Sequence, residues 1–167
     1  MTAARRSRKR HPGLFWLSYA LAALALSGIP GGLRAATTER IVVDRHTGLA
    51  IYGIDPVAYF TNRKPVAGRA DFEYRHAGAI WRFDNEGNRA AFARDPQVYM
   101  PRFGGYDPVG VSRGLSTPGY PALWVVHDER LYLFYTENAR QAFIANPAAV
   151  IAAAAARWAD VKGELAE

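Results

Sequence analysis

Apolar and polar residues alternate along two short stretches of the chain, and each stretch leads into a helical pattern. Residues 71–76 alternate charged with apolar side chains, and residues 80–83 do the same after an Ala-Gly pair. A period of two on either side of a short turn predicts a β-hairpin. Asn85 is a good helix N-cap, and the residue before Pro96 tends to leave a helix, so we expect a helix between them.

A similar pattern follows in the second half of the chain. Residues 123–127 form a nearly unbroken apolar run, which is typical of a central strand. A polar turn separates this run from a second apolar strand at 131–135. Thr136 is a good N-cap for a helix that runs to Asn146, directly before a proline.

The second pattern repeats the first at an offset of 51 residues, and the pentapeptides GIDPV (53–57) and GYDPV (105–109) precede the two patterns. Chance would explain two or three matches, whereas a whole set at one offset indicates an internal duplication. We therefore predict an α+β fold in which two duplicated hairpin–helix units pack together. The matched pairs are His76/His127, Trp81/Tyr132, Phe83/Phe134, Asn85/Thr136, Glu86/Glu137, Arg89/Arg140, Phe92/Phe143 and Pro96/Pro147.

The end of the chain is rich in alanine, the best helix former. Val150, Ala154, Trp158 and Val161 recur at helical spacing, so we expect a C-terminal helix with one apolar stripe. The expected segments are a signal peptide (1–35), an N-terminal extension (36–50), a first unit (51–101), a second unit that includes a Gly/Pro-rich connector (102–147) and the C-terminal helix (148–167).

The first residues have the order of a secretory signal peptide. The basic run RRSRKR (5–10) precedes an apolar run (14–29), and a Pro-Gly-Gly break leads to the small residues Ala35 and Ala36. We expect export to the periplasm or secretion, with cleavage after Ala35. The alternative is an uncleaved leader that anchors the chain in the inner membrane, although its apolar run is shorter than the roughly 20 residues that span a bilayer.

Charge and cysteine content exclude several functions. Six of the 21 basic residues lie in the leader with no acid, which leaves 15 basic against 15 acidic residues in the rest of the chain. We therefore expect no nucleic-acid binding, and membrane contact only through an uncleaved leader. Without cysteine the chain has no disulfide, no thiolate metal site and no cysteine nucleophile.

These residues resemble the YHS-domain family, whose unit opens with Asp-Pro-Val and continues into an aromatic hairpin and a helix. An exported bacterial subgroup is closer still: its run Gly-x-Asp-Pro-Val-Ala-Tyr-Phe stands at 53–60, and its Gly-Gly-Tyr stands at 104–106. The resemblance spans about residues 50–135. The residues that carry the family pattern are Asp55, Pro56, Val57, Trp81, Phe83, Phe92, Pro96 and Tyr99.

The resemblance implies metal handling, which related units perform through cysteines. In the exported subgroup a thiol follows Gly-Gly-Tyr, and many YHS units have cysteine directly after Asp-Pro-Val. This chain has Asp107 and Ala58 at those two positions. A thiol-dependent redox or soft-metal role is therefore not carried over, because a carboxylate prefers hard cations or hydrogen bonds.

Asp55, Tyr59, Tyr106 and Asp107 are the candidate ligand-binding residues. In one interpretation the two carboxylates converge on a shared cleft, which requires them to lie within about 10 Å of each other. In the other, each aspartate starts a turn by accepting main-chain N–H groups while the following proline presets φ. The sequence leaves both interpretations open.

His76 and His127 are candidate metal ligands together with Asp107, because the repeat places them at equivalent strand ends. Two imidazoles and a carboxylate would suit a divalent ion. The alternative is that each histidine is a partly exposed residue at the end of a hairpin.

The sequence contains no Gly-x-Ser-x-Gly, no phosphate-binding glycine loop and no dinucleotide motif. We therefore expect a non-catalytic exported protein that binds a metal ion, a small ligand or a protein partner. The alternatives are a redox or metal-handling accessory that has lost the family thiol, and a purely structural docking module.

Overall fold

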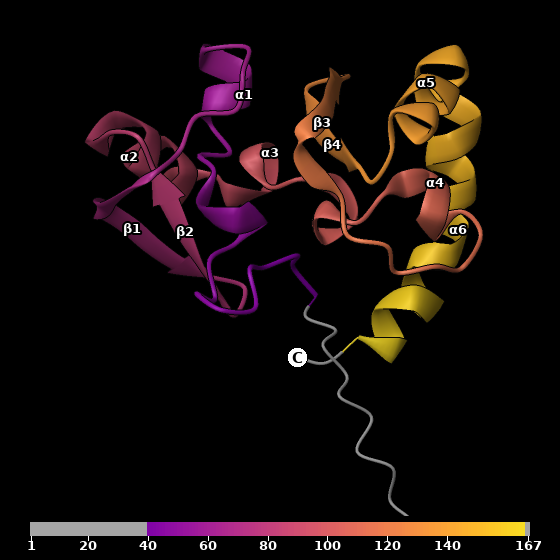
Figure 1. Cartoon of the computed structure of the whole chain (residues 1–167), viewed down its shortest axis with the longest axis horizontal. Helices are drawn as coiled ribbons and strands as arrows, with labels where there is room; N and C mark the ends of the chain where they lie inside the picture. The colour runs from indigo at the N-terminus through magenta and orange to yellow at the C-terminus, as the bar shows by residue number, and fades with distance from the viewer. Residues whose placement is uncertain (1–39, 166–167) are drawn as a thin grey trace, which may run out of the picture. The chain divides into compact units, whose positions relative to one another are not determined.

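A computed structural model of the chain describes residues 40–165, and the expected signal peptide (1–35) lies outside the described residues. The fold is a mixed α+β arrangement with two small antiparallel sheets (Figure 1). All described residues belong to one compact unit. The elements in chain order are η1 (Ile51–Gly53), α1 (Ala58–Thr61), β1 (Arg69–His76), β2 (Ala79–Phe83), α2 (Glu86–Arg94), α3 (Pro96–Tyr99), η2 (Arg102–Gly105), α4 (Pro108–Val111), β3 (Tyr120–His127), β4 (Arg130–Phe134), α5 (Glu137–Ala145) and α6 (Pro147–Glu164).

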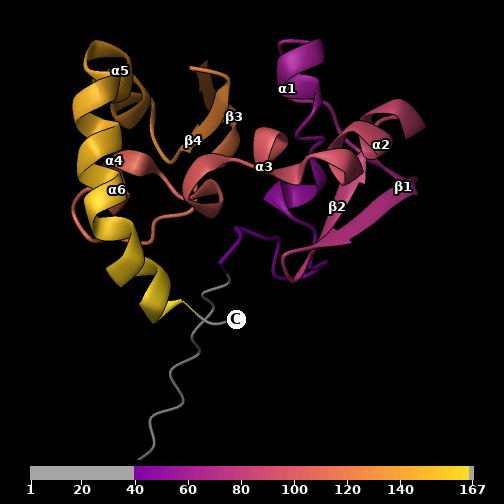
Figure 2. The ribbon, with the colours of Figure 1, turned by 180° about the vertical axis from the view of Figure 1, so that it is seen from behind.

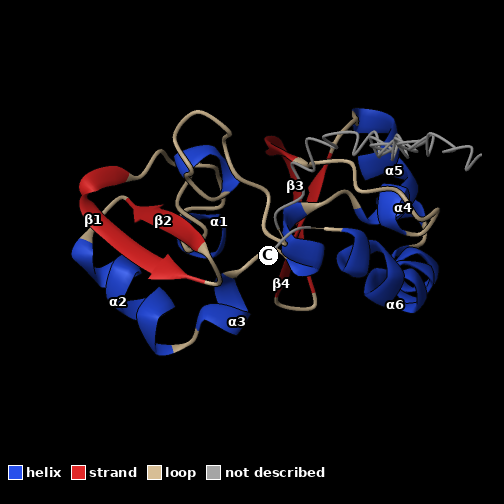
Figure 3. Ribbon diagram, turned by 90° about the horizontal axis from the view of Figure 1, so that it is seen from below, coloured by secondary structure: helices blue, strands red, loops and turns tan. Residues whose placement is uncertain are grey.

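Both predicted hairpins are confirmed, and they form separate two-stranded sheets, β1–β2 and β3–β4 (Figure 3). The first turns at Ala77 and Gly78 (φ 50° and 80°), and the second turns at Asp128 and Glu129 (φ 47° and 56°). Two consecutive residues with positive φ match the right-handed twist of the strands on either side.

The strand pairing is the same in both hairpins, 51 residues apart. Tyr74 lies opposite Trp81 in the first, and Val125 lies opposite Tyr132 in the second. In both, the register shifts within the first half of the longer strand, as a β-bulge does.

Helices α2 and α5 begin where the sequence predicts, whereas the short helices α1, α3 and α4 have no counterpart among the predicted elements. The Asn85 side chain accepts from the N–H of Asn88 at the start of α2, and the Thr136 hydroxyl accepts from the N–H of Ala139 at the start of α5. The terminal helix α6 begins at Pro147 and runs beside α4 and α5 (Figure 2).

Two apolar cores lie within the described residues. The first core contains Trp81, Phe83 and Phe92 together with residues of the 41–59 segment. The second core contains Phe134 and Phe143 together with the apolar stripe of α6. In each core the phenylalanine of the helix packs on the aromatic residues of the preceding strand, at ring-centre distances of 4.8–5.2 Å.

The β3–β4 hairpin contributes to both cores. Leu131 and Leu133 of β4 lie in the first core, whereas Tyr132 and Phe134 lie in the second. The two faces of β3 divide in the same way: Trp124 and Val126 pack on the first core, and Leu123 and Val125 on the second.

One expectation is wrong. The apolar run at 123–127 predicts a central strand, but within residues 40–165 the only strand paired with β3 is β4. The run is apolar because each face of β3 contacts a different core, and side chains alternate between the two faces of a strand. By contrast, β2 buries alternate residues only, and its Arg82 forms an ion pair with Glu73.

The connector at 102–122 is also more regular than its Gly/Pro-rich composition suggests, since it contains η2, α4 and the start of β3. Among residues 40–165 no single helix is long and apolar enough to cross a membrane. Only α5 and α6 taken together, which meet at a bend of 110°, reach the required length and composition.

Gly68 and Gly119 lie where the backbone crosses the following strand, and each donates its N–H to the carbonyl oxygen of a glycine about 15 residues earlier. A Cβ at Gly68 would lie 2.5 Å from the Arg82 carbonyl carbon, and one at Gly119 would lie 2.6 Å from the Leu133 Cβ. We expect Gly68→Ala and Gly119→Ala each to lower the free energy of unfolding by about 2–3 kcal/mol, measured by urea denaturation.

Gly163→Ala is the control, because a Cβ there meets no atom within 4 Å on an exposed position of α6. This variant should raise the stability by up to about 1 kcal/mol, since alanine favours a helix over glycine. Equal effects of the three substitutions would contradict the close backbone approach.

Candidate functional site

Asp55 is a fully buried residue whose carboxylate accepts four hydrogen bonds. Its Oδ1 accepts from the N–H of Val57 at 2.8 Å and of Ala58 at 3.3 Å. Its Oδ2 accepts from the N–H of Asp84 at 2.9 Å and from the Asn88 amide at 2.6 Å. Asp55 therefore joins the turn before α1 to the junction between β2 and α2.

Asp107 repeats this arrangement in the second half with fewer donors. Its Oδ1 accepts from the N–H of Val109 at 2.8 Å, and its Oδ2 accepts from the N–H of Tyr135 at 3.0 Å. Tyr135 follows Asp84 by 51 positions, and Ala139 stands at the position that corresponds to Asn88. Asp107 is 4% exposed, so both carboxylates face inward, each toward its own half of the chain.

Burying a carboxylate costs free energy unless donors surround it, and here main-chain N–H groups supply most of them. These contacts support the turn interpretation of both Asp-Pro pairs. Neither carboxylate lines either of the two pockets described below.

The two histidines are the last residues of β1 and β3. The His76 ring meets the edge of Phe92 at a centre distance of 6.0 Å, and the His127 ring meets Phe143 at 5.9 Å. His127 Nε2 also lies 3.3 Å from a carboxylate oxygen of the neighbouring Asp128. Across residues 40–165 no three His, Asp or Glu side chains come together in a group that could hold a metal ion, so His76, His127 and Asp107 do not form one.

Tyr59 is completely buried and links the two halves of the fold. Its hydroxyl donates to the carbonyl oxygen of Pro121 at 2.9 Å, and its ring meets Trp124 edge-on at 5.2 Å. Burial, and secondarily the charge of Asp55, raises the pKa of Tyr59. The phenol therefore stays neutral and acts as a hydrogen-bond donor between α1 and β3.

Tyr106 is the fourth predicted ligand-binding residue, and it lies in the second core at 4% exposure. Its ring centre is 6.3 Å from that of Trp158 on α6. Its main-chain N–H donates to the carbonyl oxygen of Phe103, which closes η2. The structure therefore places Tyr59 and Tyr106 in packing positions.

A pocket that the sequence did not indicate opens beside η2, with a volume of about 770 Å³. Four segments line it: residues 40–48, the β1–β2 turn, residues 97–104, and α6 through Trp158 and Lys162. Two of the lining residues in these segments are the arginines Arg40 and Arg102. The segments are far apart in the chain, so no local motif marks the pocket, and only the exposed cations and Trp158 could have drawn attention to it.

A second, shallower hollow of about 570 Å³ lies between Ile54, Pro65 and residues 120–123. The exposed rings of Tyr120 and Tyr135 stack beside it, with ring centres 5.4 Å apart. This is an apolar surface with no charged side chain among its described lining residues.

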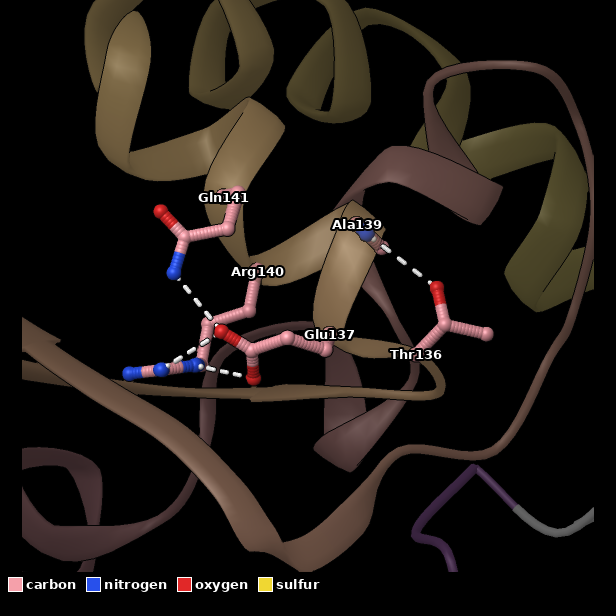
Figure 4. A network of polar contacts seen from close by, with 5 residues as sticks. All are labelled: Thr136, Glu137, Ala139, Arg140 and Gln141. Carbon is pink, nitrogen blue, oxygen red and sulfur yellow. Dashed lines mark hydrogen bonds and ion pairs between the residues drawn. The ribbon is translucent and has the colours of Figure 1, made fainter.

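A network at the start of α5 contains the most strongly shifted exposed carboxylate (Figure 4). Glu137 accepts from Nε and Nη2 of Arg140 at 2.9 and 2.7 Å, and from the amide of Gln141 at 2.6 Å. These hydrogen bonds, Arg140 first, lower the pKa of Glu137 to about 2. The corresponding Glu86 pairs with Arg89, which also lowers its pKa.

Comparisons of this chain with protein-family models, with curated proteins and with solved structures found no match.

We expect the two buried aspartates to differ in their contribution to stability. Asp55→Ala leaves four donors unpaired and should lower the free energy of unfolding by about 3–5 kcal/mol, whereas Asp107→Ala leaves two unpaired and should cost about 2–3 kcal/mol. Asn88→Ala makes the first cluster resemble the second and should cost about 1–2 kcal/mol. Urea denaturation followed by tryptophan fluorescence measures all three.

If Asp55→Ala does not fold, Asp55→Asn and Asn88→Ala still test the order. If substitution of Asp107 lowered the free energy of unfolding as much as substitution of Asp55, the cost would not follow the number of donors left unpaired.

The pKa of Glu137 should depend on Gln141. Because the folded-state pKa of about 2 lies below the reference value of 4.5, the network stabilises the fold above pH about 4.5. That contribution is lost as the pH falls toward 2. Gln141→Ala should raise the pKa of Glu137, measured by NMR titration of the carboxyl carbon, while Glu86 serves as the unchanged internal control. An unshifted Glu137 in this variant would refute a role for the glutamine.

Proposed function

We propose that this chain is a non-catalytic binding domain, exported and of the YHS type, that takes up a small ligand in the pocket beside η2. The pocket is the observation that carries the proposal, since about 770 Å³ falls within the roughly 300–1,000 Å³ of small-molecule sites. No hydroxyl, thiol, imidazole or carboxyl side chain is among its described lining residues, which supports binding rather than catalysis.

An internal duplication accounts for the two halves of the domain. Several independent features recur about 51 residues apart: the strand register, the positive-φ turns, the buried aspartates and the tightly packed glycines Gly68 and Gly119. Local preferences explain a turn or a cap, but a shared register shift together with a shared buried carboxylate supports a common origin of both units.

Asp107 supports the loss of thiol chemistry in this chain. The exported subgroup that the chain resembles carries a thiol at this position, whereas the Asp107 carboxylate accepts from two main-chain N–H groups. A carboxylate committed to those donors stabilises a turn. The redox or metal-handling alternative would need a different ligand set.

Binding of two related dyes tests the proposal. The chain is expressed with its own leader and purified as the host processes it, and its intact mass should correspond to a start at Ala36. We expect 8-anilinonaphthalene-1-sulfonate, its uncharged analogue N-phenyl-1-naphthylamine, or both, to bind the native protein at one saturable site, followed by fluorescence. Gln97→Trp, which fills the pocket from α3, should abolish this binding.

Gln141→Trp is the matched control, since Gln141 is an exposed glutamine that does not line the pocket. Loss of binding in both variants, or in neither, would refute the pocket as the ligand site. The docking-module alternative would then be preferred, and the exposed Tyr120 and Tyr135 mark the surface on which to test it.

A further inference from the structure

The pocket beside η2 gathers positive charge in a chain that is otherwise balanced. Arg40, Arg102 and Lys162 line it, and its described lining residues include no aspartate or glutamate. Outside the leader, basic and acidic residues are equal in number. Arg102 and Lys162 therefore place two positive charges at one pocket, which favours binding of an anion there.

Arg102 and Lys162 are both exposed. Within residues 40–165 neither of them forms an ion pair with an acidic side chain. The Arg102 guanidinium lies 5.7 Å from the centre of the Phe103 ring, and Lys162 stands in the last turn of α6. Both charges border the same pocket from different segments of the chain.

Apolar side chains line the rest of the pocket. Ile41, Ala79 and Phe103 line the pocket and are almost completely buried. Trp158 lines it as well and is half-buried. The wall is held in place at Gly104, whose carbonyl oxygen accepts from the N–H of Val42 at 2.8 Å. A Cβ on Gly104 would overlap the carbonyl oxygen of Arg40, so the N-terminal segment lies directly against η2.

We infer that the ligand is a free amphiphilic anion, with a carboxylate, sulfonate or phosphate group near Arg102 and Lys162 and an apolar body against Phe103 and Trp158. This inference rests on the proposed function. A neutral apolar molecule would leave Arg102 and Lys162 without an anionic partner, and a hydrophilic anion would leave the apolar wall hydrated. A volume of about 770 Å³ suits one small molecule.

The two dyes differ by the sulfonate group and therefore test the charge directly. We expect 8-anilinonaphthalene-1-sulfonate to bind at least about tenfold more tightly than N-phenyl-1-naphthylamine, and more weakly as the salt concentration rises. Arg102→Gln and Lys162→Gln should each weaken binding of the sulfonate by about threefold to tenfold and change binding of the neutral dye by less than about twofold. Arg113→Gln, an exposed arginine outside the pocket, should change neither.

Decanoate should displace the bound sulfonate dye, whereas decan-1-ol should not. Displacement by vesicles of phosphatidylglycerol but not by decanoate would overturn the assignment to a free molecule. A different outcome is that Gln97→Trp blocks both dyes while the two dyes bind equally tightly and Arg102→Gln and Lys162→Gln leave the affinity unchanged. In that case the anion inference is wrong and the proposed function stands. If neither dye binds at a site that Gln97→Trp blocks, both are wrong.

Discussion

The burial of both faces of the β3–β4 hairpin holds the described part of the chain together. Leu131 and Leu133 of β4 complete the first core, and Phe134, on the opposite face, belongs to the second. Burying one such side chain stabilises a fold by about 1.5–3 kcal/mol. The first core therefore depends on two leucines that follow Trp81 and Phe83 by 50 positions. The Tyr59 hydroxyl, which donates to Pro121, strengthens the same junction.

The two hairpins are similar in geometry but not in environment. The outer face of β2 carries Arg82 in an ion pair with Glu73, whereas β4 buries four consecutive residues. Leu131 and Leu133 of the second hairpin complete the first core, and Tyr132 and Phe134 of the same strand belong to the second core. The second hairpin therefore carries the apolar residues that connect the two cores, and the first hairpin carries the polar face.

The buried aspartates limit what the chain can do chemically. The side-chain oxygens of Asp55 and Asp107 accept hydrogen bonds that hold each opening turn to the end of its hairpin. Residues committed in this way stabilise the fold, so the proposed ligand site lies elsewhere, in a pocket of cations and apolar side chains. Its walls come from segments that meet only in the folded chain, including the α6 helix that follows the second unit.

The local elements follow from the sequence alone: both hairpins, the N-caps Asn85 and Thr136, and the apolar stripe of α6. These depend on residues a few positions apart, whose spacing reflects the period of a strand or a helix. The position of β3 between two cores depends on packing between distant segments, because an apolar run looks the same in a central strand and in one covered by two cores. The hydrogen bonds of Asp55 and Asp107 depend on it too, since the N–H groups of Asp84 and Tyr135 reach them from 29 and 28 positions away. The pocket beside η2 could not be predicted for the same reason: its cations and its apolar wall come together only when distant segments pack.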